Sequence, residues 1–461
     1  MTVFSFGDSV RGRESEGLKG FLSLEEREDG AKVLAEAPSA SKFLSEQVVR
    51  GNLVAIDRVC SVEPIVVDVA KALDVVPGMR RDLLLHAGPP ISYERACGPL
   101  RRALGGALVF EGLAATLDEA EQLLASGRVK LSPCHHHDAV GPMTGVISPS
   151  MPVLVTEDRN SGKRAYSTFN EGGGNALWLG VFERDTLERL CWIRDILAPV
   201  LKAVFKAAGG VPVWTILAQG LQMGDECHNR HAASTNIFLK SITEHLFLAS
   251  LPRDTALAAY RYISGNSHFF LNMTMSACKL AMDAANDVPY STMVTAMARN
   301  GTDFGIRVSA LGGKWFIAPA PHLKDALYNP GYGPDDGAPD IGDSAIIETM
   351  GLGGFVIAAA PAMAAIAGGG LEQALSISRR MGLITLAKNV RFPIPTLDFE
   401  GSPMGIDVRR VIDSGIVPSI DSAVVHKQGG IGQIGVGIAR APYECFGAAL
   451  EAFVSKVDRR S

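Results

Sequence analysis

The spacing of apolar residues divides the chain into regions of different character. Between residues 64 and 183, short apolar runs bounded by turn residues dominate: PIVVDV, DLLLHAG, VKLSPCHHH, MPVLVTED and RAYSTF. Runs of this length and pattern are typical of buried strands. Helices are predicted from Ser92 through YERACGPLRRALGGALVFEG, despite Pro99 in its middle, and over LDEAEQLLASG, which ends at a glycine.

Residues 184–300 have a helical pattern. Apolar side chains recur every three or four positions at Leu187, Leu190, Ile193, Leu197, Val200 and Val204. This spacing places them on one face of a helix, which the Gly209-Gly210 pair ends. The segments NIFLKSITEHLFLASL and FFLNMTMSACKLAMDAAND continue the pattern.

Strand-like runs, DFGIRVSA and KWFIAPA, return after residue 300 and precede a loop-rich segment at 328–355. The order of elements predicts an α+β fold of several mixed α/β lobes with a helical insert in the middle. We expect an N-terminal arm and small α/β lobe (1–105), an α/β lobe with a His-rich strand (106–183), a helical lobe (184–300) and a C-terminal α+β lobe (301–461). Within the arm, residues 23–37 are expected to be helical.

Composition narrows the class of protein. Of 461 residues, 47% are hydrophobic and 20% are charged, and the formal net charge is −5. This charge argues against nucleic acid or an anionic membrane as a partner, because no basic excess exists. No apolar run is long enough to span a bilayer, and the charged N-terminus does not resemble a signal peptide. Seven cysteines without a CxxC pair indicate reduced thiols, so we expect a cytoplasmic protein.

The first candidate for chemistry is CHHHD at residues 134–138. Nearby proline and glycine argue against a helix, so we expect a strand with His135 and His137 on one face. His136 would then share the other face with Cys134 and Asp138. A His-x-His pair on a strand could supply two ligands to a divalent metal, which needs further ligands.

The second candidate is GDECHNRH at residues 224–231. Asp225 is a plausible helix N-cap, and spacing of three would place His228 and His231 on one helical face. If this segment meets CHHHD, the histidines could bind a metal, transfer protons or hydrogen-bond a substrate. Inert packing in the core is the remaining interpretation. We favour a polar active-site strand, in which Glu226 or Asp138 orients a histidine.

Two glycine-rich stretches could hold an anion. In HKQGGIGQIGVGIARAP, Gly430, Gly432 and Gly435 spell GxGxxG, but no helix follows until after Pro442, so a dinucleotide site is not indicated. A turn with exposed N–H groups beside Lys427 remains. In GLGG (351–354), the N–H groups of Gly353 and Gly354 would open a helix.

Carboxylates gather upstream of GLGG at Asp335, Asp336, Asp340, Asp343 and Glu348. Their spacing does not fit an EF-hand, so a solvated loop is the favoured interpretation, with Mg²⁺ as the alternative. Isolated polar residues stand in apolar or glycine-rich surroundings elsewhere in the chain: Arg95, Asn266, His268, Asp303, Arg307 and Asp407.

Long stretches of the chain resemble the YlbE/YahG-like family, long described only as a domain of unknown function. The resemblance is carried by these stretches, in the family's order between residues 83 and 442: LLLHAGPPISYERACGP, SPCHHHDAVGPMTGVISPSMPV, YSTFNEG, GDECHNR, NSHFFLN, RNGTDFGIRVS, YNPGYGPDDGAPDIGDSAIIETMGLGGF, LDFEGSPMGID and HKQGGIGQIGVGIARAP.

The resemblance implies a catabolic carbamoyltransferase or one of its subunits. Family members accompany an FdrA-like subunit in allantoin and ureide breakdown, as in oxamate carbamoyltransferase, where oxalurate and phosphate give oxamate and carbamoyl phosphate. It implies phosphate as co-substrate, a small ureide carboxylate as substrate and an FdrA-like partner. We also expect a homo-oligomer. It assigns no catalytic residues.

Phosphorolysis of a ureide needs groups that hold phosphate, stabilise an oxyanion and protonate the departing nitrogen. A histidine at 135–137 or His228 could be the acid. The anions could be held by the following residues: Arg95, Arg230, Asn266, His268, Arg307, Gly353, Gly354, Lys427, Gly430 and Gly432. Two alternatives remain open, a metal-dependent amide or ureide hydrolase and a non-catalytic subunit of an FdrA-containing complex.

Overall fold

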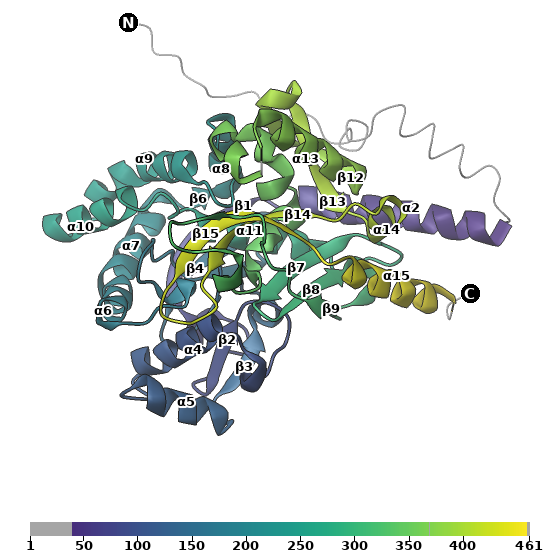
Figure 1. The fold of residues 1–461 in the computed structure, drawn as a ribbon. Helices are drawn as coiled ribbons and strands as arrows, with labels where there is room; N and C mark the ends of the chain where they lie inside the picture. Colours follow the sequence, from purple (N-terminus) through teal and green to yellow (C-terminus); the bar gives the residue numbers. More distant parts are fainter. Residues whose placement is uncertain (1–38, 368, 459–461) are drawn as a thin grey trace, which may run out of the picture.

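Helix α11 (Leu271–Ala284) lies at the centre of the fold, where strands and helices from distant parts of the chain surround it (Figure 1). The computed structural model describes residues 39–367 and 369–458, so the helix expected at 23–37 lies outside it. Every residue of α11 from Leu271 to Met282 is buried. The helix packs against α2 (Ser39–Cys60), α8 (Val213–Gln222) and α12 (Ile346–Met350).

The strands form several small sheets, which confirms the predicted α+β class. The first is antiparallel, in the order β5 (Arg164–Ser167), β4 (Pro152–Asp158), β1 (Pro64–Lys71), β6 (Val211–Pro212). The second sheet has the order β11 (Ile341–Gly342), β7 (Val294–Asn300), β8 (Asp303–Val308), β9 (Phe316–Pro319). The third sheet has the order β10 (Leu327–Tyr328), β15 (Gln433–Arg440), β14 (Ser419–Val425). β12 (Thr385–Ile394) pairs with β13 (Glu400–Ile406), and β2 (Leu83–His86) pairs in parallel with β3 (Lys130–Pro133).

The first sheet joins strands from three of the four lobes expected from the sequence. β1 comes from the range 1–105, β4 and β5 from 106–183, and β6 from 184–300. This sheet crosses two of the expected lobe boundaries. The division into four lobes stays a prediction.

The strand predicted through the histidines is wrong beyond Pro133. β3 ends there, and residues Cys134–His137 form a turn of 3₁₀ helix, η3. Asp138 follows with φ 51° in the left-handed region, and the N–H of Ala139 donates to the carbonyl of Cys134 at 3.1 Å. This tight turn removes the strand alternation, so the histidines do not divide between two sheet faces.

The helical pattern after residue 184 is confirmed. α6 (Arg184–Trp192), a π-helical turn η5 (Ile193–Leu197) and α7 (Ala198–Ala208) run consecutively. The six apolar positions form one face, with five buried and Leu187 half-buried. α9 (Ala232–Leu248) and α10 (Arg253–Ser264) lie beside them, in teal in Figure 1.

The helix predicted from Ser92 is shorter than expected. Only a 3₁₀ turn, η2 (Tyr93–Arg95), follows Ser92, and α4 (Gly98–Phe110) begins after Cys97. Pro99 explains the difference, because proline lacks the N–H that a helix interior needs but fits the first turn. The predicted helix at 117–127 is confirmed as α5 (Leu117–Ala125), capped by Thr116. The described part of the chain contains four further α-helices: α3 (Ala72–Val75), α13 (Leu371–Leu383), α14 (Val408–Ser414) and α15 (Tyr443–Asp458).

The segment expected as a long irregular loop is partly the core of the molecule. Residues 340–360 are buried without a break, so a fully solvated loop of carboxylates is wrong. Short elements follow one another there: β11, η8 (Asp343–Ala345), α12 and η9 (Gly353–Ala359). We call residues 340–354 the central segment.

Arg299 of β7 fixes the start of the central segment. Its side chain is fully buried and donates to both oxygens of Asp340, at 2.7 and 3.0 Å. It also donates to the Gly342 carbonyl at 2.8 Å and to the Ser422 hydroxyl of β14 at 3.0 Å. One guanidinium thus links the second sheet, the central segment and the third sheet. None of the helices between residues 39 and 458 combines the length and hydropathy that a bilayer-crossing helix needs.

Candidate functional site

Residues 225–231 form a turn rather than the predicted helix. Gly224 (φ 92°) and Cys227 (φ 72°) adopt left-handed backbone angles, and α9 begins only at Ala232. Asp225 therefore does not start a helix within its own segment. Its carboxylate instead accepts the backbone N–H groups of Ala233 (3.1 Å) and Ser234 (2.7 Å), in the first turn of α9. The expected shared helical face of His228 and His231 is wrong for the same reason.

His228 pairs with the central segment. Its Nδ1 lies 2.7 Å from Oε1 of Glu348, and both side chains are buried. Because a carboxylate only accepts, Nδ1 must carry the proton in this contact. Nε2 makes no hydrogen bond to any described residue. This is the orientation in which a carboxylate holds an imidazole so that its second nitrogen can exchange a proton with a substrate.

Three buried carboxyl groups surround His228, and we call Glu226, His228, Glu348 and Asp421 the acid cluster. Oε1 of Glu226 accepts the backbone N–H groups of His228, Asn229 and Arg230. One oxygen of each acid is buried without a hydrogen-bond partner: Glu226 Oε2, Glu348 Oε2 and Asp421 Oδ2.

Two of these acids have raised pKa values. Burial raises the pKa of Glu226, and burial together with the charges of Glu226 and Glu348 raises the pKa of Asp421 well above its ordinary value. The acid cluster therefore places carboxyl groups that favour the protonated form beside an imidazole.

Several of the other predicted residues lie around the acid cluster. The Arg230 guanidinium is 37% exposed, and its Nε lies 3.6 Å from Asp225, beyond hydrogen-bonding distance. His268 contacts the carbonyl of Asn229 through Nε2 at 2.6 Å, and Asn266 accepts the backbone N–H of His268 at 3.1 Å. The Arg230 side chain thus lies near Asp225, two residues along the chain from His228, whereas His268 and Asn266 support the turn.

Gly353 and Gly354 also lie beside the acid cluster, but not as phosphate donors. The N–H of Gly353 donates to the Glu226 carbonyl at 2.7 Å, and that of Gly354 donates to Glu348 at 2.9 Å. A Cβ on Gly353 would lie 2.1 Å from Glu348 Oε1, so glycine is needed for the close approach. The prediction that these N–H groups bind phosphate is wrong, because both are already bonded.

The CHHHD stretch contributes to a second group, which we call the imidazole cluster: His86, His135, His136, Arg307 and Trp315. Trp315 Nε1 donates to Nε2 of His136 at 2.9 Å, and the ring of His135 meets Trp315 edge-on at 5.5 Å. The Arg307 guanidinium lies 5.9 Å from the centre of the Trp315 ring. His135 and His136 have lowered pKa values, mainly because of burial, so both are neutral.

His137 is held apart from this cluster. Its Nδ1 contacts the Pro77 carbonyl at 2.6 Å and its Nε2 contacts the Ser132 hydroxyl at 2.8 Å. Both ring nitrogens are therefore occupied, which is the arrangement of a structural histidine.

The two clusters meet the same segment on different sides. His135 Nε2 lies 3.7 Å from Asp343, and His228 binds Glu348. These carboxyl groups are five residues apart, Asp343 in η8 and Glu348 in α12. The expected meeting of CHHHD with GDECHNRH thus occurs through the central segment, without direct contact between their histidines. Among residues 39–367 and 369–458, no three or more His, Cys, Asp or Glu side chains are arranged to hold a metal ion.

The glycine turn at 429–432 lies in neither cluster. Lys427 Nζ donates to the Asp335 carbonyl at 2.6 Å, and the N–H of Gly430 donates to Gly180 at 2.8 Å. The backbone N–H of His426 donates to the carbonyl of Gly432 at 2.9 Å. A Cβ on Gly98 of α4 would lie 2.4 Å from the Lys427 carbonyl, so this turn packs tightly on α4. Arg95, half-exposed, pairs with Asp303 at 2.7 Å on another surface.

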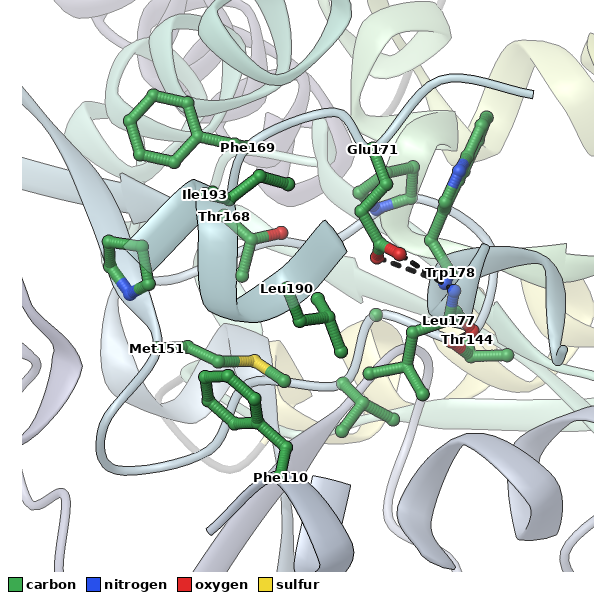
Figure 2. Close-up of a pocket in the computed structure, with 14 residues that line it drawn as sticks. Phe110, Thr144, Met151, Thr168, Phe169, Glu171, Leu177, Trp178, Leu190 and Ile193 are labelled. Atoms are coloured by element: carbon green, nitrogen blue, oxygen red, sulfur yellow. Dashed lines mark hydrogen bonds between the residues drawn. The ribbon is translucent and has the colours of Figure 1, made fainter. Parts of the chain in front are cut away.

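Figure 2 shows the residues around a small cavity, which is lined mostly by apolar side chains such as Phe110, Met151 and, from α6, Leu190. Its volume of about 30 Å³ admits about one water molecule, so it is too small for a substrate. The carboxyl group of Glu171 lies at its edge and accepts the N–H groups of Leu177 (2.7 Å) and Trp178 (3.3 Å).

Burial raises the pKa of Glu171 from 4.5 to about 7. The folded state then binds this proton more tightly than the unfolded state, so its contribution to stability is lost as the pH rises toward 7. We expect Glu171→Gln to reduce the fall in unfolding free energy between about pH 5 and pH 8 by roughly 1–3 kcal/mol. Urea unfolding at both pH values measures this, with exposed Glu188→Gln as control. An unchanged pH dependence in Glu171→Gln would contradict it.

Known proteins are similar to this chain over most of its length. A family model for the oxamate carbamoyltransferase subunit AllG matches residues 129–344. The Escherichia coli K12 protein of that name is 40% identical over 413 residues, which is 89% of this chain and 98% of the relative. The chain belongs to the AllG family. The uncharacterized protein YahG of the same organism is 43% identical over 411 residues, 89% of this chain and 87% of YahG.

A solved structure shares the fold of this AllG-family chain. It is the crystal structure of a conserved protein of unknown function from Enterococcus faecalis V583, with a TM-score of 0.88 and 41% identity. The match covers 91% of this chain and 99% of that chain. The match to the AllG family model includes both histidine segments, residues 134–138 and 224–231, whereas Glu348 and Asp421 of the acid cluster lie beyond the matched residues.

Sequence reasoning missed two residues of the acid cluster. Glu348 was attributed to a solvated loop, although it precedes an apolar run and ETMGLGG carries no other charge. Asp421 stands in the apolar strand SIDSAVV, where an isolated carboxylate is a signal of a buried polar contact.

Proposed function

We propose that the chain is a carbamoyltransferase subunit that takes part in phosphorolysis of an oxalurate-like ureide, at the acid cluster. The observation that carries the proposal is the Glu348–His228 pair, with its free Nε2 beside buried acids whose pKa values are raised. The name of the E. coli relative supports the reaction class.

The chemistry needs one proton to move. Hydrogen phosphate attacks the ureido carbonyl carbon, the bond from this carbon to the oxamate nitrogen breaks, and carbamoyl phosphate and oxamate form. Phosphate loses a proton and the departing nitrogen gains one, so a single imidazole that accepts and then donates suffices. His228 Nε2 is proposed for this role, with Glu348 as the group that orients it.

The substrate carboxylate requires a cation near this imidazole. Arg230 lies two residues from His228, is partly exposed and has only a distant contact to Asp225. We assign to Arg230 the role of binding the carboxylate of the ureide, because a guanidinium can donate two parallel hydrogen bonds to such a group. Asn266 and His268 act through the turn that positions Arg230 and His228.

An assay of the chain alone and together with its FdrA-like partner tests the proposal. Oxalurate and phosphate are supplied, and carbamoyl phosphate and oxamate are measured. We expect phosphate-dependent release of oxamate that requires this chain. Activity of the partner alone at the same rate would make the chain a scaffold, and absence of phosphate-dependent cleavage in the assembled complex would overturn the reaction.

A further inference from the structure

Buried polar atoms without partners collect in the imidazole cluster. They are Nε2 of His86, both ring nitrogens of His135 and Nε of Arg307. His86 and His135 are 0% and 3% exposed. Folded proteins pair the great majority of such atoms, so four in one place indicate a bound group.

These side chains converge on one location. His86 pairs in register with Pro133, directly before η3, which carries His135. Gly88, two residues after His86, donates to Asp343 Oδ1 at 2.8 Å, and the same oxygen lies 3.7 Å from His135 Nε2. His136, Arg307 and Trp315 continue the group toward the surface, because His136 is exposed and the other two are half-buried.

Two glycines make room for the largest members. A Cβ on Gly305 would lie 2.8 Å from the Trp315 ring, and one on Gly313 would lie 2.9 Å from the Arg307 guanidinium. The Trp315 ring is rigid, so glycine at position 305 keeps room for it, whereas the end of the flexible Arg307 side chain could shift to relieve the second contact.

The cluster presents both hydrogen-bond donors and acceptors. Arg307 contributes a positive charge, whereas the buried Lys279 is paired with Asp283. Burial raises the pKa of Asp343, which lies 3.7 Å from His135, from 3.8 to about 7. His86 Nδ1 contacts the Ala87 carbonyl at 2.8 Å, so it carries the ring proton. Burial lowers the pKa of His86 to about 4, so its Nε2 is an unprotonated acceptor. A neutral His135 likewise offers one donor and one acceptor.

We propose that the imidazole cluster binds a small anion that combines an oxyanion with one O–H or N–H donor. Arg307 Nε–H and the His135 donor bind the oxyanion, and His86 Nε2 accepts from the ligand's donor group. Hydrogen phosphate and an α-amide carboxylate such as oxamate share this chemistry. The site is separate from the acid cluster and does not depend on the reaction at His228.

Calorimetric titration of the full chain with four probes tests the site. Inorganic phosphate is compared with sulfate, which has the same shape but no proton near neutral pH, and oxamate is compared with oxalate, which lacks the N–H. We expect phosphate, oxamate or both to bind at least ~10-fold more tightly than the matched partner, because an unpaired buried acceptor weakens the analogue. Which of the two binds identifies the source of the anion.

Two variants assign the binding to this cluster. Arg307→Gln is expected to weaken the binding at least ~10-fold, whereas Arg184→Gln removes an exposed arginine of α6 and leaves it unchanged. Trp315→Phe should abolish any ligand-induced change in tryptophan fluorescence while the calorimetric signal persists. This second variant assigns the binding to the cluster if Arg307→Gln does not fold.

Three results would overturn the inference: no binding of any probe, equal binding of phosphate and sulfate together with equal binding of oxamate and oxalate, or undiminished binding by folded Arg307→Gln. Binding is measured without turnover, so the two proposals are tested separately. Absence of binding would not contradict the proposed reaction, and an inactive complex would not contradict the proposed anion site.

Discussion

His228→Gln is expected to lower the rate of phosphate-dependent ureide cleavage by ~10²-fold or more, with little change in the affinity for the ureide. Glutamine keeps the approximate size of the side chain and can still donate to Glu348, but it has no nitrogen that gains and loses a proton near neutral pH. The measurement is kcat and KM of the assembled complex. Since the contact at Nε2 forms only when the proton moves, kcat should carry the loss.

Glu348→Gln separates a reacting group from a positioning group. The amide oxygen can still accept from His228 Nδ1 but carries no charge to stabilise an imidazole that gains a proton, so kcat should fall less than in His228→Gln, with KM for the ureide unchanged. The matched control is His322→Gln, an exposed histidine, which should leave the rate unchanged. If folded His228→Gln turned over normally, proton transfer at this residue would be excluded.

Asp340→Ala is expected to destabilise the chain by about 3–5 kcal/mol, because it leaves the fully buried Arg299 guanidinium unpaired. Arg299 and Asp340 both have side chains without any exposure. Urea unfolding measures the change, and exposed Asp335→Ala is the control, with an expected effect within ~0.5 kcal/mol. The double substitution Arg299→Met with Asp340→Leu should recover much of the loss, since no charge remains buried. A loss below ~1 kcal/mol for Asp340→Ala would contradict the assigned role of this pair.

The sequence predicted those elements whose pattern is local. The strands at 64–71 and 152–158 and the amphipathic run from 184 to 208 follow from short-range periodicity, and all three are observed. The His-rich strand and the helix at Asp225 failed because left-handed residues, Asp138 and Cys227, redirect the backbone there. Neither residue is glycine, which most often adopts such angles, although Gly224 precedes Cys227 in the second turn.

The site was predicted in part. Glu226, His228 and Arg230 stood out because charged and imidazole groups are adjacent in one short stretch. Their partners Glu348 and Asp421 lie more than a hundred residues away, in segments whose burial comes only from tertiary packing. The phosphate role of Gly353 and Gly354 failed because their donors serve Glu226 and Glu348, a relationship that no local pattern encodes.

Helix α11 has a consequence for synthesis of the chain. It is buried on every side from Leu271 to Met282, and part of its cover comes from α12, which begins more than sixty residues later. At ~5–20 residues per second, the ribosome needs several seconds to deliver that cover. During this interval part of the α11 surface lacks its partner, so transiently exposed apolar surface on the nascent chain is a consequence of placing the core in mid-sequence.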